Sequence, residues 1–572
     1  MDSRDGAPPS PAPVESPSSA PPDPAPPPPS GSPSAPPSAL APLRLPLFRA
    51  LWLATVASNV GTWLQSVGAA WLMTGLSDST TLVALVQAAS SLPMFLLSLP
   101  AGALADVLDR RRLLLGAQAW MLAVAAVLAL ATGLGRIGPW SLLALTFALG
   151  LGAAFTHPAW QAVVPELVPR EELPRAVALN SVGFNLGRAA GPAAGGLIVA
   201  AAGPTANFAL NAASFLVVLV VLWRWDRPGV ESFLPAERFL GAMRTGLRYV
   251  RHSPGVLAVI ARCAAFVLCG SALWALLPVV ARDELGRGPT GYGFLLAAFG
   301  GGAVAGAFAL PRLRGRSGST DGVVAVATVV FAAALAVLGW VREYALVAAA
   351  LFAAGGAWLS LLSSLNVAVQ TLVPSWVRAR ALSVYMLAFF GGLAGGSALW
   401  GGAAERWGVR AALTGAAAAM LVGLAATARV HLRSGEGLDL APSRQWPAPI
   451  VRHSLEPERG PVLVTVRFRI DPARVEEFRL AMAERRRIRL RDGALQWGLF
   501  ADSADPGRYT EVFLVRTWLE HLRQHERVTF ADSEIDDRAR AFHLGPGPPE
   551  VEHLIGDRVP KRLEDLPGVG AG

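Results

Sequence analysis

The sequence predicts an all-α polytopic membrane protein that carries a small soluble α+β domain after its last membrane segment. Hydrophobic residues make up 53% of the 572 residues and charged residues only 16%, with a mean hydropathy of +0.42. A water-soluble chain of this size rarely has this balance. Apolar segments recur between residues 47 and 431, each near the roughly 20 residues that a helix needs to cross the hydrocarbon core. Beyond residue 430 they stop, and alternating patterns typical of strands begin.

Twelve segments fit a membrane-spanning helix, which satisfies all its backbone hydrogen bonds internally. They fall into two halves of six. The segments run approximately over Phe48–Gly75, Leu82–Ala105, Leu113–Leu134, Trp140–Val164, Ala176–Ala202, Thr205–Trp225, Val256–Ala281, Gly291–Leu310, Asp321–Val341, Ala345–Val373, Ala379–Ala404 and Arg410–Arg429.

The loops on one side of the predicted bundle carry far more arginine than the loops on the other. The richer side includes Arg110, Arg111 and Arg112 after the second segment. By the positive-inside rule this side is cytoplasmic, which places both chain termini in the cytoplasm and the protein in the inner (plasma) membrane. The net charge of +9 follows from these arginines, so no nucleic-acid partner is expected.

Composition divides the chain into seven parts. The first is rich in Pro, Ala and Ser, which predicts disorder, and the middle linker carries Phe239, Met243 and Leu247 at helical spacing beside arginines, which predicts an amphipathic surface helix. The parts are a tail (1–42), a six-helix bundle (43–225), a cytoplasmic linker (226–254), a second six-helix bundle (255–433), a second linker (434–460), the soluble domain (461–556) and a short tail (557–572).

An internal repeat supports two related halves. A shift of 204 residues places Gly102, Arg110 and Arg112 on Gly306, Arg314 and Arg316, and it also places Gly187 and Gly191 on Gly391 and Gly395. Because glycine and arginine are abundant in this chain, these matches alone do not prove a repeat. It indicates two like-oriented six-helix units related by an axis along the membrane normal.

The soluble domain shows strand and helix patterns in the order βαββαβ. Strands are predicted over 462–470, 494–500, 509–517 and 551–555, and helices over 472–491 and 518–530. This order predicts a ferredoxin-like domain. The two cysteines of the chain, Cys263 and Cys269, fall in one apolar segment on different helix faces, so we expect no disulfide, metal site or cofactor.

The loop after the second segment reads GALADVLDRRR from Gly102 to Arg112. It resembles the loop motif of the major facilitator superfamily, with Asp109 where that family has Gly. The resemblance implies that Gly102, Asp106 and Arg110 form a cytoplasmic gate between the halves. A carboxylate near a helix N-terminus gains roughly 0.3 to 1 kcal/mol, enough to bias two nearly balanced states. The alternative is a loop whose arginines only set the topology.

The fifth segment contains GRAAGPAAGG, and this run resembles the antiporter signature of drug exporters in the same superfamily. Glycines four apart allow helices to approach closely, and the proline leaves a carbonyl without its helical partner. We therefore expect a conformational role, with ordinary small-residue packing as the alternative, and the resemblance implies export. The residues concerned are Gly187, Gly191, Pro192, Gly195 and Gly196.

Arg188 lies near the middle of the fifth segment, where an ionised side chain costs at least ~2.5 kcal/mol unless it faces the interior. It is the first candidate for substrate binding, with structural pairing to an interior polar group as the alternative. Arg262 is a weaker candidate because its side chain can reach the cytoplasmic surface. Five polar residues are further candidates for substrate contact or interhelical hydrogen bonds: Asn59, Gln65, Asn185, Asn366 and Gln370.

No acidic residue stands clearly in mid-membrane, so the proton coupling expected for this superfamily has no identified carrier except the weak candidates His157 and Glu166. The runs FTHPAW from Phe155 and VPELVPREEL from Val164 resemble the subgroup that contains the enterobactin exporter. This resemblance implies a secondary transporter of small molecules by alternating access, an exporter of amphipathic drugs or siderophore-like compounds.

The soluble domain resembles the dimeric α/β-barrel proteins of the antibiotic-biosynthesis monooxygenase type. That resemblance implies a homodimer through this domain, and it leaves open whether the domain is an oxygenase or only a binding module. Two alternatives to the exporter therefore stay open: a membrane-anchored oxidoreductase and an importer of the same fold. Trp497, His521 and His525 are candidates to line a cavity in the domain, with core and surface roles as the alternative.

Overall fold

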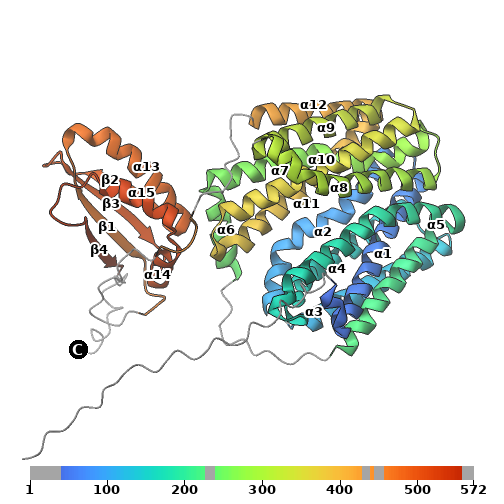
Figure 1. Cartoon of the computed structure of the whole chain (residues 1–572), viewed down its shortest axis with the longest axis horizontal. Helices are drawn as coiled ribbons and strands as arrows, with labels where there is room; N and C mark the ends of the chain where they lie inside the picture. The colour runs from blue at the N-terminus through green and yellow to red at the C-terminus, as the bar shows by residue number, and fades with distance from the viewer. Residues whose placement is uncertain are drawn as a thin grey trace, which may run out of the picture.

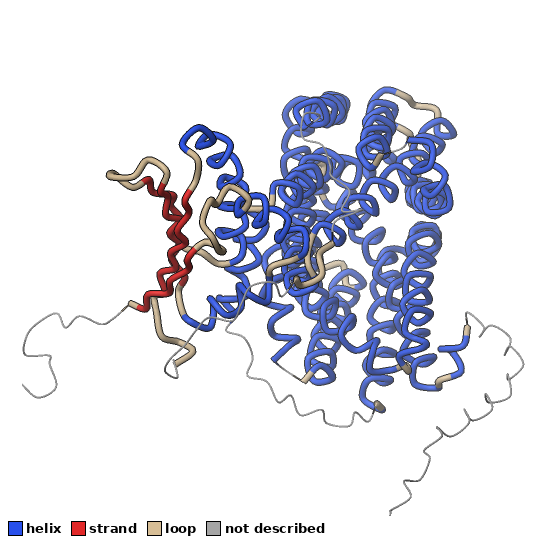
Figure 2. The backbone as a smooth tube through the Cα atoms, turned by 60° about the vertical axis from the view of Figure 1, so that its left-hand side comes forward, coloured by secondary structure: helices blue, strands red, loops and turns tan. Residues whose placement is uncertain are grey.

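The computed structural model describes residues 40–107, 109–225, 239–317, 319–427, 439–443 and 456–556. Within these ranges the chain forms a body of long helices with a smaller domain beside it, and this domain contains a four-stranded sheet (Figure 1). In Figure 2 the helices of the domain lie on the side of the sheet that faces the helical body. The described residues leave out 1–39 and 557–572 of the predicted tails, and 226–238, 434–438 and 444–455 of the predicted linkers.

The first half of the body holds five helices that pack around its own apolar core, which includes Leu128 and Phe208. Proline occupies the first turn of three of them, where the missing N–H would have no helical partner. The helices are α1 (Pro46–Leu76), α2 (Thr80–Val107), α3 (Arg110–Gly133), α4 (Pro139–Leu167) and α5 (Leu173–Arg224).

Helix α5 reverses direction at Gly203. This glycine has φ +75°, and Pro204 follows it. The Asn207 side chain donates to the Gly195 carbonyl at 3.2 Å, although an unbroken helix would separate these residues by about 18 Å. The 52 residues of α5 therefore form two antiparallel segments, which correspond to the fifth and sixth predicted segments.

The second half holds six long helices, and its core includes Phe331 and Leu361. A shorter helix, α6 (Phe239–Arg251), precedes it. A π-helical turn at Val280–Glu284 extends the first long helix. The six helices are α7 (Pro254–Val279), α8 (Pro289–Ser317), α9 (Thr320–Trp340), α10 (Tyr344–Leu372), α11 (Ser375–Trp407) and α12 (Val409–Thr427).

Ten helices within the described residues are long and apolar enough to cross a membrane. Helix α1 is not one of the ten, and α5 is counted once although it reverses at Gly203. The fold is therefore a mostly helical polytopic membrane fold. Twelve membrane spans would require α1 to cross the membrane and the two segments of α5 to cross it once each, so twelve spans stay a prediction.

The two halves repeat one packing arrangement. Helix α5 contacts α1 in its own half and α8 in the other, while α11 contacts α7 in its own half and α2 in the other. Gly391, which the repeat aligns with Gly187, faces the Phe95 ring of α2. The helices α2, α5, α8 and α11 thus form the boundary between the halves, as like-oriented repeats would place them.

The C-terminal domain has an antiparallel sheet with strand order β2-β3-β1-β4. Phe478 and Met482, which the sequence places on one helix face, are fully buried against the sheet. Along the chain the elements are β1 (Val462–Arg469), α13 (Val475–Asp492), β2 (Gln496–Ala501), β3 (Arg508–Val515), α14 (Trp518–Arg527), α15 (Phe530–Arg540) and β4 (Glu550–Ile555).

The second predicted helix of this domain is two helices. Val528 is extended, and the Thr529 hydroxyl then accepts a hydrogen bond from the Asp532 N–H, so that the two residues form a capping box. A capping box starts a helix, which explains why α14 ends and α15 begins within a few residues. The sequence analysis did not anticipate α15.

Helix α6 lies where the sequence predicts an amphipathic surface helix, and part of its surface is buried on protein. Leu247 is 61% exposed, whereas Tyr249 and Val250 are buried. The side chains of the other two predicted apolar positions, 239 and 243, lie outside the described residues. The buried face packs on protein, because Gly246 meets the Arg380 side chain of α11 and α6 also contacts α13.

The C-terminal domain docks on α6 and on the start of α11. Arg248 of α6 forms an ion pair with Glu520 of α14 at 3.2 Å. The guanidinium of Arg527 lies 4.6 Å from the ring centre of Trp376 in α11. Helix α11 is one of the boundary helices, so the docked domain contacts an element that must move if the halves move.

Candidate functional site

The glycine-rich run of α5 lies between the two halves. On one face of the run, side chains of α1 lie directly against the glycines. A Cβ at Gly187 would lie 3.1 Å from the Asn59 Cβ, and one at Gly191 would lie 2.6 Å from the Trp63 Cβ. On another face, a Cβ at Gly196 would lie 2.5 Å from the Pro289 carbonyl of α8. Only glycine permits such approaches, so the run packs α5 against both halves at once.

Arg188 lies in the middle of this contact region. Its backbone carbonyl approaches Gly300 of α8, and its guanidinium carbon lies 5.6 Å from the centre of the Phe299 ring, within the range of a cation–π contact. Its Nη2 atom is buried and has no hydrogen-bond partner among the described residues. A buried guanidinium nitrogen without an acceptor is unfavourable, and a bound ligand that supplies an acceptor would remove this penalty.

The Phe299 ring beside Arg188 belongs to a group of aromatic rings that crosses the boundary between the halves. Phe299 of α8 contacts Trp274 of α7, with ring centres 4.8 Å apart, and Trp274 contacts Trp63 of α1 across the boundary at 6.3 Å. Trp358 of α10 joins Phe299 and Trp274 at 6.3 and 6.1 Å. We call Trp63, Trp274, Phe299 and Trp358 the aromatic cluster. It is apolar and polarisable, and it adjoins a cation, which suits an aromatic or amphipathic ligand.

The other predicted polar candidates divide into two groups. Asn59 faces Gly187 at the contact of α1 with α5, and the buried Gln65 accepts from Asn211 at 3.5 Å. The remaining candidates bond locally. Gln370 donates to Asn366 at 2.6 Å within α10, and Asn185 donates to the Ser181 carbonyl of its own helix at 2.8 Å.

The predicted cytoplasmic gate is only partly visible. Arg110 is paired with Glu166 at the end of α4, at 2.6 Å, and Asp109 accepts from the Arg112 N–H at 2.8 Å as the N-cap of α3. The side chains of residues 102–107, Gly102 and Asp106 among them, lie outside those that the structure describes. The substitution of Asp for the family's Gly at 109 therefore has a local explanation, because Asp is a preferred N-cap.

The sequence analysis missed a contact at the opposite end of the boundary. Glu405, near the C-terminal end of α11, accepts from the Thr81 N–H at 3.0 Å and from the Ser79 hydroxyl at 2.9 Å. It thereby caps the N-terminus of α2 in the other half. Trp71 of α1 stacks on Tyr292 of α8 nearby, with ring centres 6.1 Å apart. An acidic residue beside a short polar loop gave too weak a signal to predict this pairing.

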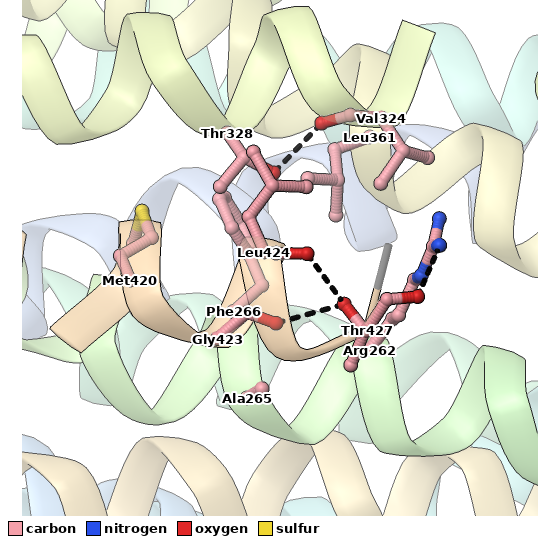
Figure 3. A pocket seen from close by; sticks show the side chains of 10 residues that line it. All are labelled: Arg262, Ala265, Phe266, Val324, Thr328, Leu361, Met420, Gly423, Leu424 and Thr427. Atoms are coloured by element: carbon pink, nitrogen blue, oxygen red, sulfur yellow. Dashed lines mark hydrogen bonds between the residues drawn. The ribbon is translucent and has the colours of Figure 1, made fainter. Parts of the chain in front are cut away.

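Arg262 does not reach the surface, contrary to expectation. It is 6% exposed, forms an ion pair with Asp321 at the start of α9 and donates to the Thr427 carbonyl of α12 at 2.8 Å. Figure 3 shows Arg262 at the edge of a small pocket among α7, α9, α10 and α12. The nearby Asp321 carboxylate removes the need for snorkelling, so Arg262 ties three helices together.

A family model described as Transmembrane secretion effector (MFS_3) matches residues 37–560. The chain belongs to this family of major facilitator superfamily transporters. The enterobactin exporter EntS of Shigella boydii serotype 4 (strain Sb227) is 30% identical to the transporter over 373 residues, which cover 62% of this chain and 85% of EntS. The multidrug efflux pump Tap of Mycolicibacterium fortuitum is 28% identical over 359 residues, which cover 60% of this chain and 84% of Tap.

Solved structures share the fold of the transporter. A bacterial homologue of the lysosomal transporter Spinster, inward-facing and unoccupied, superposes with a TM-score of 0.53 at 16% identity and covers 68% of this chain and 98% of its own. A bacterial homologue of the iron transporter ferroportin, inward-facing, gives 0.52 at 16% identity with 67% and 98% coverage. At these identities the comparison shows the fold alone.

Proposed function

We propose that this transporter exports a small amphipathic compound, drug-like or siderophore-like, by alternating access across the inner (plasma) membrane. The relatives EntS and Tap are an enterobactin exporter and a multidrug efflux pump, and the glycine-rich run of α5 supports movement of one half against the other. The proposal includes the direction of transport, which is export, and a siderophore-like or drug-like substrate. It also includes twelve membrane spans with both termini in the cytoplasm.

The observation that carries the proposal is Arg188 beside the aromatic cluster. The buried Nη2 of Arg188 requires an acceptor, and the rings around it favour a planar or apolar body. We infer a substrate that combines an oxygen acceptor or negative charge with an aromatic or amphipathic skeleton. Asn59, beside Gly187, and Gln65 both lie on α1, which packs against α5. We assign them to the proposed site together with Asn185, Asn366 and Gln370, whose hydrogen bonds described above stay within their own helices.

Transport into inside-out membrane vesicles tests both the direction and the site. We expect energised vesicles to accumulate a catecholate or an amphiphilic drug, and Arg188→Ala to reduce the initial rate by about tenfold or more, because a charge-assisted contact is lost. Arg406→Ala, which removes an exposed arginine at the end of α11, is the matched control. Accumulation only in right-side-out vesicles would make the protein an importer, and an unchanged rate in Arg188→Ala would contradict the proposed site.

Coupling to a proton is also part of the proposal. Glu166 is the one acidic candidate from the sequence, and its carboxylate pairs with Arg110 of the proposed gate. We propose that Glu166 exchanges a proton when movement of the gate breaks this ion pair. His157, the other candidate, has an exposed side chain on α4. A protonophore should abolish accumulation in vesicles if the coupling ion is H⁺, whereas insensitivity to it would point to another ion.

For the C-terminal domain we propose a ferredoxin-like dimerisation or regulatory module. The sheet face that points away from the domain's helices carries Leu463, Leu514 and Leu554 in register, and Leu554 is 52% exposed, as expected of a face that pairs with a second copy. A monooxygenase activity is the competing function. Oxygen consumption by the purified full chain with a quinol would favour the enzyme, and a dimer lost in Leu554→Glu without oxygen consumption would favour the module.

A further inference from the structure

Three histidines converge in the C-terminal domain, away from the transport site. His521 and His525 lie one turn apart on α14, and His553 lies on β4, the edge strand of the sheet. Their rings pack closely: the His521 ring centre is 4.9 Å from that of His525 and 4.7 Å from that of His553. One nitrogen atom from each ring lies within 4.8 Å of the other two. We call these residues the histidine triad.

We propose that the histidine triad binds a divalent transition-metal ion, with Zn²⁺ as the ion that its geometry fits. The Nε2 atoms of His521 and His525 are 3.3 Å apart. Two nitrogens at roughly 2.0 to 2.1 Å from a tetrahedral Zn²⁺ lie about 3.3 to 3.4 Å from each other. The pair on α14 therefore already has the spacing of two ligands, and residues four apart on a helix face are suited to supply it.

Hydrogen bonding and ring packing are the alternative explanation for the triad. His521 also packs on Trp518 at 5.4 Å between ring centres, and the 3.3 Å contact with His525 is compatible with one imidazole donating to the other. His553 also packs on the Trp518 ring, at 6.0 Å between ring centres, so ring packing can hold all three side chains. A metal site requires in addition that one nitrogen from each ring lies close to the other two, and the triad meets this requirement.

The protonation state of the triad suits a metal. Burial lowers the pKa of His521 to about 3 and that of His525 to about 4, and burial also lowers the pKa of His553. All three imidazoles are therefore neutral at pH 7, and each offers one nitrogen lone pair, which is the form that ligates a metal.

The surrounding charges are balanced by ion pairs. Arg489 is close enough to contribute to the lowered pKa of His521 and His525, but its guanidinium pairs with Glu511 at 3.3 Å and lies 3.9 Å from Asp536. Arg485 shares both carboxylates, at 3.1 Å from Glu511 and 3.4 Å from Asp536. The two arginines and the two carboxylates therefore balance in charge beside the triad.

The second shell and the access route also fit a metal site. Gln524 is 1% exposed and lies beside His521, where its amide can orient a ligating imidazole through the other ring nitrogen. His521 is buried, whereas His525 and His553 are partly exposed. An ion can enter from that side, and three protein ligands leave a fourth position for water or an added ligand.

Metal binding to the purified full chain tests the proposal, and the chain should carry no polyhistidine tag. We expect one Co²⁺ per chain, with the visible absorption of a tetrahedral nitrogen site, and displacement by Zn²⁺. His525→Gln and His553→Gln should each weaken Co²⁺ binding by more than about tenfold. His543→Gln, which changes a histidine outside the triad in the same domain, should bind as the unmodified chain does.

A second measurement separates metal binding from folding. Zn²⁺ should raise the melting temperature of the unmodified chain and of His543→Gln, because it binds the folded state, and it should not raise that of His525→Gln or His553→Gln. The proposal is overturned if the full chain shows no saturable binding of Co²⁺ or Zn²⁺. It is equally overturned if both triad variants bind the metal as tightly as His543→Gln.

Discussion

At the scale of single residues, Arg188 is a buried cation whose guanidinium contacts an aromatic ring, while its Nη2 has no hydrogen-bond acceptor among the described residues. Phe299 stabilises the guanidinium through its ring face, but a ring cannot accept the N–H groups as a carboxylate or hydroxyl oxygen can. Arg262 shows the contrast, because Asp321 and the Thr427 carbonyl accept its N–H groups. The two arginines therefore have different roles, one toward a ligand and one toward neighbouring helices.

Charge and geometry at Arg188 can be separated by two substitutions. Arg188→Gln removes the charge, and we expect the affinity for an anionic aromatic substrate to fall by roughly 10- to 100-fold, as for the loss of a charge-assisted hydrogen bond. Arg188→Lys keeps the charge but not the planar fork, so an intermediate loss is expected. Equilibrium binding of a labelled substrate in detergent measures both. Equal affinities in Arg188→Lys and Arg188→Gln would show that the charge is not recognised.

At the scale of elements, α5 is the helix that both halves hold. Its glycines meet α1 on one face and α8 on the other, so a bulky residue on the α8 face should act on the relative position of the halves. Gly196 is the most informative position, because a Cβ there would lie 2.5 Å from the Pro289 carbonyl oxygen and 3.0 Å from the Gly293 Cα. Backbone atoms cannot rotate away as a flexible side chain can.

We expect Gly196→Val to reduce the transport rate by at least about tenfold, because it blocks the close approach of α5 and α8. Gly395→Ala on α11, where a Cβ would meet nothing within 4 Å, should leave the rate unchanged. Vesicle transport, normalised to the amount of folded protein by size-exclusion chromatography, is the measurement. Full activity in Gly196→Val would mean that this contact does not take part in the transport cycle.

The docking of α14 on α6 is the second contact between elements that makes a prediction. The Arg248–Glu520 side chains are 22% and 16% exposed, so their pairing is only partly screened by water, and a coupling energy of about 0.5 to 1.5 kcal/mol is expected. A double-mutant cycle with Arg248→Gln and Glu520→Gln, read by hydrogen exchange in α6, measures it. The exposed pair Arg538–Glu484 is the control, and a zero coupling at Arg248–Glu520 would show that the domain is not held there.

At the scale of the whole molecule, hydropathy and motifs were enough to predict most of the architecture. Apolar length predicts a helix wherever lipid is the solvent, and a glycine run predicts a close helix contact. The sequence could not say which helix fills the other side of that contact. Gly196 against Pro289, and Glu405 against the start of α2, depend on residues that are far apart in the chain, and no local pattern encodes their meeting.

Tertiary partners explain what the sequence could not predict for Arg262 and α6. Asp321 pairs with Arg262, which is buried where its side chain was expected to reach the surface. Helix α11 and the C-terminal domain cover part of α6, while Leu247 stays exposed. Of the histidine triad, His521 and His525 were predicted as candidates to line a cavity. His553 was not predicted, because it lies on a strand about 30 residues further along the chain.

In the proposed transport cycle the two halves move against each other about the boundary helices. The boundary contacts named above run from the middle of the helices, at Arg188 with Gly300, to the end marked by Glu405 and by Trp71 with Tyr292. The orientation proposed above, with both termini in the cytoplasm, places this end on the periplasmic side. Alternating access in that orientation requires these contacts to open during each cycle.

The most direct test is a reversible crosslink between Trp71→Cys and Tyr292→Cys, whose parent rings lie 6.1 Å apart. The two natural cysteines, which are buried, are first replaced by alanine. We expect that the disulfide forms, that the crosslinked protein no longer transports in vesicles, and that a reductant restores transport. A crosslinked protein that transports at the rate of the reduced protein would contradict it.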